Sequence, residues 1–384
     1  MEAGTLLVEV GALVFLLSFV ARLAATLGIS PIPLYVITGL ALGEGGALPL
    51  ITAEEFLEVG AEIGVILLLL MLGVEYAGAE LVQGLRTSAR VAALDFACNF
   101  GAGVAVAVAV GMSAPAALVV GGVTYASSSG VVAKLIDDLG WMGNRETPGV
   151  LALLVSEDLI MAVYLPILGV LLIGASAGRA TVQLAVALTA VGTALVLAIR
   201  FGTLLSRWLF TRFTEAMLLG AFGLALLVAG AAAMIQVSAA VGAFIVGIAI
   251  SGPAQELSRE LLRPLRDLFA ALFFTFFSLT VDPRDIPPVL LTAVVLVVVT
   301  AATKYAVVVW GAATQGLGPP ARRRAGLLML ARGEFSIIIA ELGIAAGLDE
   351  RIGPLAVTYV LLLAVGAPLL LRLQTPPHPA LSLS

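Results

Sequence analysis

Residues 147–174 read TPGVLALLVSEDLIMAVYLPILGVLLIG, a stretch long and apolar enough to cross a membrane as one helix. Two adjacent acids, Glu157 and Asp158, interrupt it near its middle. A carboxylate at the centre of a bilayer-spanning helix costs about 2.5–3.5 kcal/mol on insertion scales. Ionisable groups in such positions usually face a protein interior or a water-filled cavity, and they mark pathways for ions or protons. The stretch therefore predicts a membrane-embedded fold with a polar site inside it.

The composition of the whole chain is that of a polytopic membrane protein. Of the 384 residues, 61% are hydrophobic and 12% are charged, and the mean hydropathy is +1.12. Soluble globular proteins carry about 25% charged residues. The sequence shows no nucleophile–base set, metal-ligand cluster or phosphate-binding loop, so it predicts neither an enzyme nor a bound cofactor.

Apolar runs bounded by charged residues, proline or glycine predict thirteen transmembrane helices with no soluble domain between them. In chain order the predicted spans are 4–26, 30–49, 57–74, 86–111, 114–138, 147–174, 180–204, 213–235, 238–252, 263–281, 288–314, 322–347 and 352–373. The predicted fold class is therefore an all-α polytopic membrane protein.

The distribution of lysine and arginine predicts the orientation of the chain. Apart from Lys304 and Arg332, which lie within predicted spans, fifteen of the remaining eighteen basic residues fall on one side of the membrane. By the positive-inside rule that side is the cytoplasm, so we expect the amino terminus outside and the carboxyl terminus inside. An even number of spans would mix the two groups of basic residues, which supports the count of thirteen.

The two halves of the chain resemble each other at a nearly constant offset, with residues 39–42 (GLAL) matching residues 247–250 (GIAI) 208 positions apart. Residues 129–135 (SGVVAKL) match residues 336–342 (SIIIAEL), and residues 72–75 (LGVE) match residues 279–282 (LTVD), both 207 positions apart. Seven predicted spans separate each segment from its counterpart. Because that number is odd, the two halves are predicted to be inverted repeats, an architecture of many secondary transporters.

Charged residues within the predicted spans fall at a similar depth. In the predicted topology, Asp158 and Lys304 both lie about 4–5 Å to the cytoplasmic side of the midplane. Consecutive helical residues diverge by about 100°, so Glu157 and Asp158 face different ways. We expect Lys304 to be the charge partner of Glu157, and Asp158 to face a cavity where it binds an ion or a proton. The alternative is a structural ion pair that joins two helices and leaves Asp158 unexplained.

Asp158 and Glu157 are the acids of the candidate ion- or proton-binding set, and hydroxyl groups extend it. Thr124, Ser127 and Ser128 have the i, i+3, i+4 spacing of one helix face. A local helix break there would offer hydroxyls and carbonyls to a cation, whereas the alternative is ordinary packing of small residues. At the matching position of the second half, Arg332 and Glu334 predict another helix break, in which these two residues pair with each other and have a structural role.

These features resemble the monovalent cation:proton antiporter-2 family, which includes sodium/proton exchangers and potassium-efflux transporters. The resemblance covers nearly the whole chain, and its most specific part combines Glu157-Asp158, Lys304 and the run 332–336 (RGEFS). It also includes residues 39–43 (GLALG), 68–75 (LLLMLGVE), 127–129 (SSS), 242–247 (GAFIVG) and 273–279 (FFTFFSL).

The resemblance implies a sodium/proton-antiporter-like fold with two broken, crossing helices and an elevator-like mechanism. The implied parts are dimer-forming panels (1–81 and 211–286), core segments (82–178 and 287–373), a linker (179–210) and a cytoplasmic tail (374–384). It implies a homodimer and places the family's ion-binding aspartate at Asp158. Many electrogenic members have Asp at the preceding position and many others have Asn or Gln, whereas this chain has Glu157. Efflux members often carry a nucleotide-binding regulatory domain after the last helix, whereas the sequence here stops at Ser384, so any such control would need a separate cytoplasmic subunit.

The sequence therefore predicts a plasma-membrane transporter that exchanges Na⁺ or K⁺ for protons by alternating access. The alternatives are a cation channel and a non-transporting membrane sensor on the same fold. A channel usually needs a repeated filter or a ring of charge, and the sequence shows neither. Ligand type alone does not distinguish Na⁺ from K⁺, and the sequence does not predict the stoichiometry.

Overall fold

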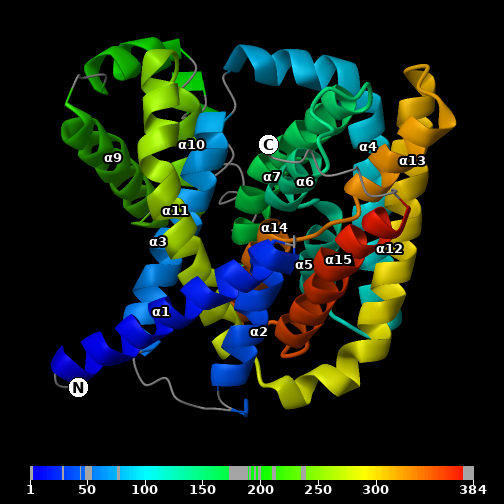
Figure 1. Ribbon diagram of the computed structural model, residues 1–384, viewed down its shortest axis with the longest axis horizontal. Helices are drawn as coiled ribbons and strands as arrows, with labels where there is room; N and C mark the ends of the chain where they lie inside the picture. The colour runs from blue at the N-terminus through cyan, green and yellow to red at the C-terminus, as the bar shows by residue number, and fades with distance from the viewer. Residues whose placement is uncertain are drawn as a thin grey trace, which may run out of the picture. The chain divides into compact units, whose positions relative to one another are not determined.

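The protein is described by a computed structural model in which helices make up almost all of the described chain (Figure 1). The described residues are 3–27, 30–43, 45–47, 54–75, 78–172, 200–209, 213–234 and 239–374, with isolated positions between 189 and 197. Most of the predicted span 180–204 and of the predicted linker 179–210 lies outside them, as does nearly all of the tail 374–384. No strand occurs within the described residues.

The helices confirm the all-α polytopic fold class. They are α1 (Ala3–Leu27), α2 (Ile32–Leu42), α3 (Glu54–Glu75), α4 (Gly78–Ala109), α5 (Ala114–Tyr125), α6 (Ser129–Asp138), α7 (Thr147–Leu172), α9 (Thr214–Met234), α10 (Ala239–Ala249), α11 (Pro253–Leu279), η1 (Pro283–Asp285), α12 (Ile286–Thr314), α13 (Pro319–Leu328), α14 (Glu334–Ala345) and α15 (Ile352–Gln374). Among the described helices, six contain stretches long and apolar enough to cross a membrane.

Two of the predicted spans are each divided into two helices, as expected. The chain leaves the helical conformation between α5 and α6 and again between α13 and α14. Ala126 is extended, with φ −75° and ψ 133°. Because α5 ends at Tyr125, Thr124 lies in the helix while Ser127 and Ser128 lie in the break, so their spacing does not place the three on one helix face.

Several predicted boundaries differ from the structure. α11 begins at Pro253 rather than at 263, because its first turns carry charged residues that hydropathy alone excludes from a span. α4 begins at Gly78 rather than at 86 for a similar reason, and α2 ends at Leu42 rather than at 49. Gly252, with φ +63°, provides the turn before α11.

The chain divides into two compact units, of which the first comprises residues 1–14, 50–84 and 158–277. Within it, α10 packs between α3 and α9 (Figure 1). Gly73 of α3 and Gly247 of α10 permit a backbone-to-backbone approach, since a Cβ on Gly73 would lie 2.8 Å from the Cα of Gly247. Small residues at helix crossings are typical of membrane proteins.

The second unit comprises residues 15–49, 85–157 and 278–384. Within it, α12 packs against α13 and α15, and α14 packs against α5 and α15. This unit contains both helix breaks, Glu157 and Lys304, and therefore most of the predicted site residues. The boundary between the two units falls within α7, so Asp158 belongs to the first unit.

Candidate functional site

The two helix breaks contact each other through their backbones. The amide of Ser128 donates to the carbonyl of Ala331 at 2.9 Å, and the Ser127 hydroxyl donates to the carbonyl of Met329 at 3.0 Å. Gly333 permits this approach, because a Cβ there would lie 2.6 Å from the Ser128 hydroxyl oxygen. Segments about two hundred residues apart therefore cross at one point and satisfy the backbone groups that the breaks release.

Arg332 lies in the break between α13 and α14, where it contacts the C-terminal end of α5 and is fully buried. Its Nε donates to the Thr124 carbonyl at 3.3 Å, and its Nη1 donates to the Ser127 hydroxyl at 3.3 Å and to the Met329 carbonyl at 3.0 Å. A cation at a helix C-terminus is favourable because the free carbonyls there carry partial negative charge. Arg332 therefore stabilises the end of the first half-helix.

Glu334 contacts the start of α6 instead of pairing with Arg332. Its carboxylate accepts hydrogen bonds from the hydroxyls of Ser128 at 2.6 Å and Ser129 at 3.1 Å. An acid at a helix N-terminus complements the free N–H groups there. The expected pair between Arg332 and Glu334 is not formed, because Arg332 binds the end of α5 and Glu334 binds the start of α6; these contacts are consistent with a structural role for both.

Lys304 of α12 is the centre of a buried charged cluster. Its Nζ lies 2.6 Å from Oδ2 of Asp95, 3.0 Å from the Tyr125 carbonyl oxygen and 3.1 Å from Oε1 of Glu157. Lys304, Asp95 and Glu157 all have side chains with 0% exposure. The predicted pair of Lys304 and Glu157 is thus present, and Asp95 is a second acid on the same ammonium group.

Sequence reasoning missed Asp95 and its neighbour Asn99. Both are fully buried in α4, and the Asn99 amide donates to Oδ1 of Asp95 at 2.8 Å. The Thr303 hydroxyl donates in turn to the side-chain oxygen Oδ1 of Asn99 at 3.0 Å. The signal for this pair was two polar residues at i, i+4 spacing inside an apolar span, which place two polar groups on one helix face.

Glu157 and Asp158 are both buried in α7, at 0% and 1% exposure. Both oxygens of Glu157 bind donors, since Oε1 accepts from Lys304 and Oε2 accepts from the Ser127 amide at 2.6 Å. Asp158 is the next residue, and its side chain diverges from that of Glu157 by about 100° around the helix. The Glu157 contacts indicate a positioning role, whereas the binding role expected of Asp158 stays a prediction.

The three predicted hydroxyls all contact protein groups. Besides the Ser127 and Ser128 contacts above, the Thr124 hydroxyl donates to the Asn99 carbonyl at 3.0 Å. All three side chains are at most 1% exposed. A hydroxyl that donates one hydrogen bond keeps lone pairs for a cation, so these contacts are compatible with the expected role.

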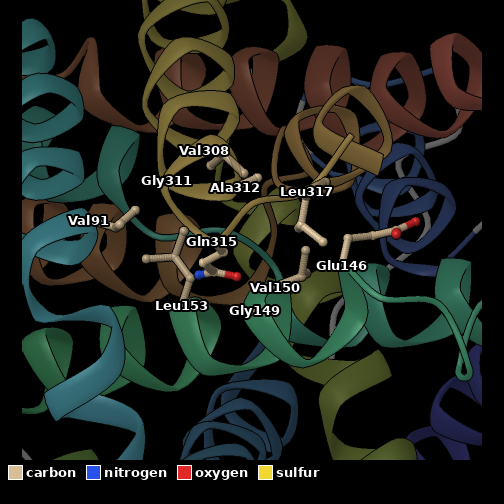
Figure 2. A pocket seen from close by; sticks show the side chains of 11 residues that line it. Val91, Glu146, Gly149, Val150, Leu153, Val308, Gly311, Ala312, Gln315 and Leu317 are labelled. Atoms are coloured by element: carbon tan, nitrogen blue, oxygen red, sulfur yellow. The ribbon is translucent and has the colours of Figure 1, made fainter. Parts of the chain in front are cut away.

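A cavity of about 20 Å³ lies near the start of α7, between it and the ends of α12 and α13 (Figure 2). This volume holds about one or two water molecules. Gln315 extends among its apolar walls, and Glu146 lies at its rim. Its lining residues include no member of the Lys304 cluster, so this cavity is separate from the charged site.

Glu146 has a lowered pKa for a specific reason. Burial opposes ionisation, but hydrogen bonds from Arg324 (2.5 Å) and Asn144 (3.2 Å) to its carboxylate bring the pKa below the ordinary value of 4.5. Because the folded pKa is depressed, the ionised group stabilises the fold above pH 4.5, and this contribution is lost as the pH falls through the lowered pKa.

Glu146→Gln is therefore expected to lower the free energy of unfolding near neutral pH by about 1 kcal/mol. Thermal unfolding of the purified variant and the wild type should differ at pH 7 and converge in strong acid. An equal difference at both pH values would show that packing, and not the charge, is responsible.

Gly333→Ala is expected to lower the free energy of unfolding by about 1–3 kcal/mol, because the added methyl group clashes with Ser128 at the crossing of the two breaks. Gly366→Ala is the matched control, since a Cβ at that helical position meets no atom within 4 Å. Thermal unfolding in detergent compares the two, and equal stability in both variants would contradict a tight crossing.

Comparisons with known proteins cover nearly the whole chain. A family model described as "Sodium/hydrogen exchanger, transmembrane" matches residues 12–373. The chain is 31% identical over 376 residues to the K(+)/H(+) antiporter subunit KhtU of Bacillus subtilis, covering 96% of this chain and 93% of the relative. It is 32% identical over 349 residues to the ammonium/H(+) antiporter subunit AmhT of Alkalihalophilus pseudofirmus, covering 89% and 87%.

A solved structure has the same architecture. The sodium proton antiporter MjNhaP1 from Methanocaldococcus jannaschii at pH 8 superposes with a TM-score of 0.74 and covers 96% of both chains. The sequence identity is 16%, so this likeness establishes the fold and no finer property.

Proposed function

This chain belongs to the sodium/hydrogen exchanger family and exchanges a monovalent cation for protons across a membrane, and from that premise we propose that Asp158 binds the two in turn. The observation that carries this proposal is the division of roles in α7. Lys304 and the Ser127 amide hold both oxygens of Glu157, while the equally buried Asp158 follows it on another face. A carboxylate inside a membrane needs a compensating cation or proton.

The mechanism we propose is competition at one carboxylate. A proton on Asp158 removes the charge that attracts the cation, and a bound cation displaces the proton. Thr124, Ser127 and Ser128 would supply hydroxyl and carbonyl oxygens to the bound cation, which is consistent with their position at the helix break. Alternating access would move the core segments 82–178 and 287–373 against the panels 1–81 and 211–286, with residues 179–210 as the linker.

We infer that the cation is K⁺ or one of similar size. The relatives at 31% and 32% identity are named as K⁺ and ammonium antiporters, and these two cations have similar radii. Na⁺ is the competing candidate, because other relatives at 25–26% identity are named Na⁺/H⁺ antiporters.

The assembly we propose is a homodimer in the plasma membrane, with its amino terminus outside and its carboxyl terminus in the cytoplasm. The distribution of basic residues supports this orientation. The relatives from Bacillus subtilis and Alkalihalophilus pseudofirmus are both named as antiporter subunits, which supports regulation by a separate cytoplasmic subunit.

The test is proton movement in everted membrane vesicles with a pH-sensitive dye, after addition of K⁺, NH₄⁺, Rb⁺, Na⁺ or Li⁺. We expect saturable alkalinisation of the vesicle interior that is strongest with K⁺ or NH₄⁺. Large cation currents without proton movement would indicate a channel, and the absence of any cation-dependent flux would favour a sensor; either result would contradict exchange.

A further inference from the structure

The Lys304 amine has a hydrogen-bond environment that fits only its protonated form. Three oxygens surround Nζ, from Asp95 (2.6 Å), Tyr125 (3.0 Å) and Glu157 (3.1 Å). An ammonium group has three donors and no acceptor, which matches three acceptors. A neutral amine would direct its lone pair at one of these oxygens, and the interaction would be repulsive.

Both acids in this cluster have the contacts of ionised carboxylates. Oδ1 of Asp95 accepts from the Asn99 amide, while Oδ2 accepts from Lys304. The two oxygens of Glu157 likewise accept from N–H donors. Hydrogen bonds from N–H groups to both oxygens stabilise the charged form of a carboxyl group.

The guanidinium group of Arg332 supplies the second positive charge and completes the charge balance. Arg332 donates to the Ser127 hydroxyl at 3.3 Å, while the Ser127 amide donates to Glu157. Asp95, Glu157, Lys304 and Arg332 all have 0% exposure, and their formal charges sum to zero. A neutral set with satisfied hydrogen bonds avoids the cost of a net charge in a membrane interior.

The remaining polar neighbours of this set are two uncharged tyrosines and two further acids. α5 contributes the uncharged Tyr125, whose ring centroid lies 5.2 Å from Nζ of Lys304. α15 contributes Tyr359, whose hydroxyl contacts that of Thr300 at 2.8 Å. The acid of α14, Glu334, contacts the serine hydroxyls at the start of α6, and Asp158 adds the one further charge of α7.

We propose that Asp95 is a positioning residue of the transport reaction, which acts through Lys304 to keep this amine protonated throughout the cycle. Asp158 is then the one group that exchanges its proton, and each monovalent cation exchanges for one proton without net charge movement. This inference rests on the proposed function, because it assigns a stoichiometry to the same site.

The wild-type protein tests this inference directly in proteoliposomes that contain a pH dye and a permeant anion to dissipate any membrane potential. When the cation gradient equals the proton gradient, a one-for-one exchanger has no net driving force. We therefore expect the dye signal to stay constant at equal gradients and to change on either side of that point. Steady proton flux at equal gradients would overturn the inference, whereas no flux at any gradient would instead overturn the proposed function.

Asp95→Asn tests the role of Asp95 itself. The substitution leaves Glu157 with two cations, Lys304 and Arg332, so that loss of the Lys304 proton would restore neutrality. We expect Lys304 in this variant to release its proton when the cation binds and to regain it when the cation leaves. Two protons then exchange for each cation, which moves the point of zero flux to a proton gradient equal to the square root of the cation gradient. An unchanged zero-flux point in an active variant would overturn the role of Asp95. A merely structural role would change the rate but not this point.

Lys304→Arg provides an independent test if Asp95→Asn does not fold. Arginine stays charged in proteins, so it can replace a lysine that keeps its proton but not one that releases it. We expect a slower exchange with the wild-type zero-flux point. Loss of exchange in folded Lys304→Arg protein, or a shifted zero-flux point, would overturn the inference. Asp349→Asn, which removes a carboxylate that pairs with Arg351 in the loop before α15, is the control and should keep both the rate and the zero-flux point.

Discussion

Asp158→Asn is expected to reduce cation-dependent proton movement to the background of vesicles that lack the protein. The asparagine amide is uncharged and does not accept a proton at physiological pH, so the variant binds neither the cation nor the proton at this position. The neighbouring Glu157 does not replace it, because Lys304 and the Ser127 amide hold both of its oxygens. The measurement is dye-reported exchange at matched amounts of protein in the membrane.

The control for this variant is Asp267→Asn. Asp267 is exposed and pairs with the adjacent Arg266 at 2.7 Å, a kind of contact that contributes little to stability. It should exchange at the wild-type rate. Normal exchange by Asp158→Asn would remove Asp158 from the mechanism, and loss in both variants would indicate a general effect of charge.

Lys304→Gln is expected to lower the free energy of unfolding by about 3–5 kcal/mol, the usual effect of removing one partner from a buried ion pair. The substitution leaves Asp95 and Glu157 close together without the ammonium that separates them, and both have 0% exposure. Protonation of one acid would relieve part of the repulsion. Thermal unfolding in detergent at neutral pH measures the loss.

A combined variant separates charge from packing. Lys304→Gln together with Asp95→Asn and Glu157→Gln removes all three charges and keeps polar side chains of similar size. If the charges cause the loss, this variant should be more stable than Lys304→Gln alone, because it leaves no buried carboxylate without its cation. A triple variant that is less stable than the single one would contradict this explanation.

The sequence was sufficient for the features that depend on patterns along the chain. Hydropathy predicts the fold class because each lipid-crossing segment must be apolar over a fixed length. The interruptions at residues 126–128 and 329–333 were predictable because hydroxyls, glycine and charge are unfavourable in a continuous membrane helix. The contact between Lys304 and Glu157 was predictable because two opposite buried charges at one depth stabilise each other only as a pair.

The other polar contacts across helices are shown only by the tertiary structure. Asp95 joins Lys304 because α4, α7 and α12 come together there, and hydropathy contains no information about which faces of three helices converge. Arg332 and Glu334, only two positions apart, separate to opposite half-helices because the crossing places a C-terminus and an N-terminus on either side of them. Patterns along a chain determine which segments enter the membrane, whereas the partners of a buried charge depend on three-dimensional packing.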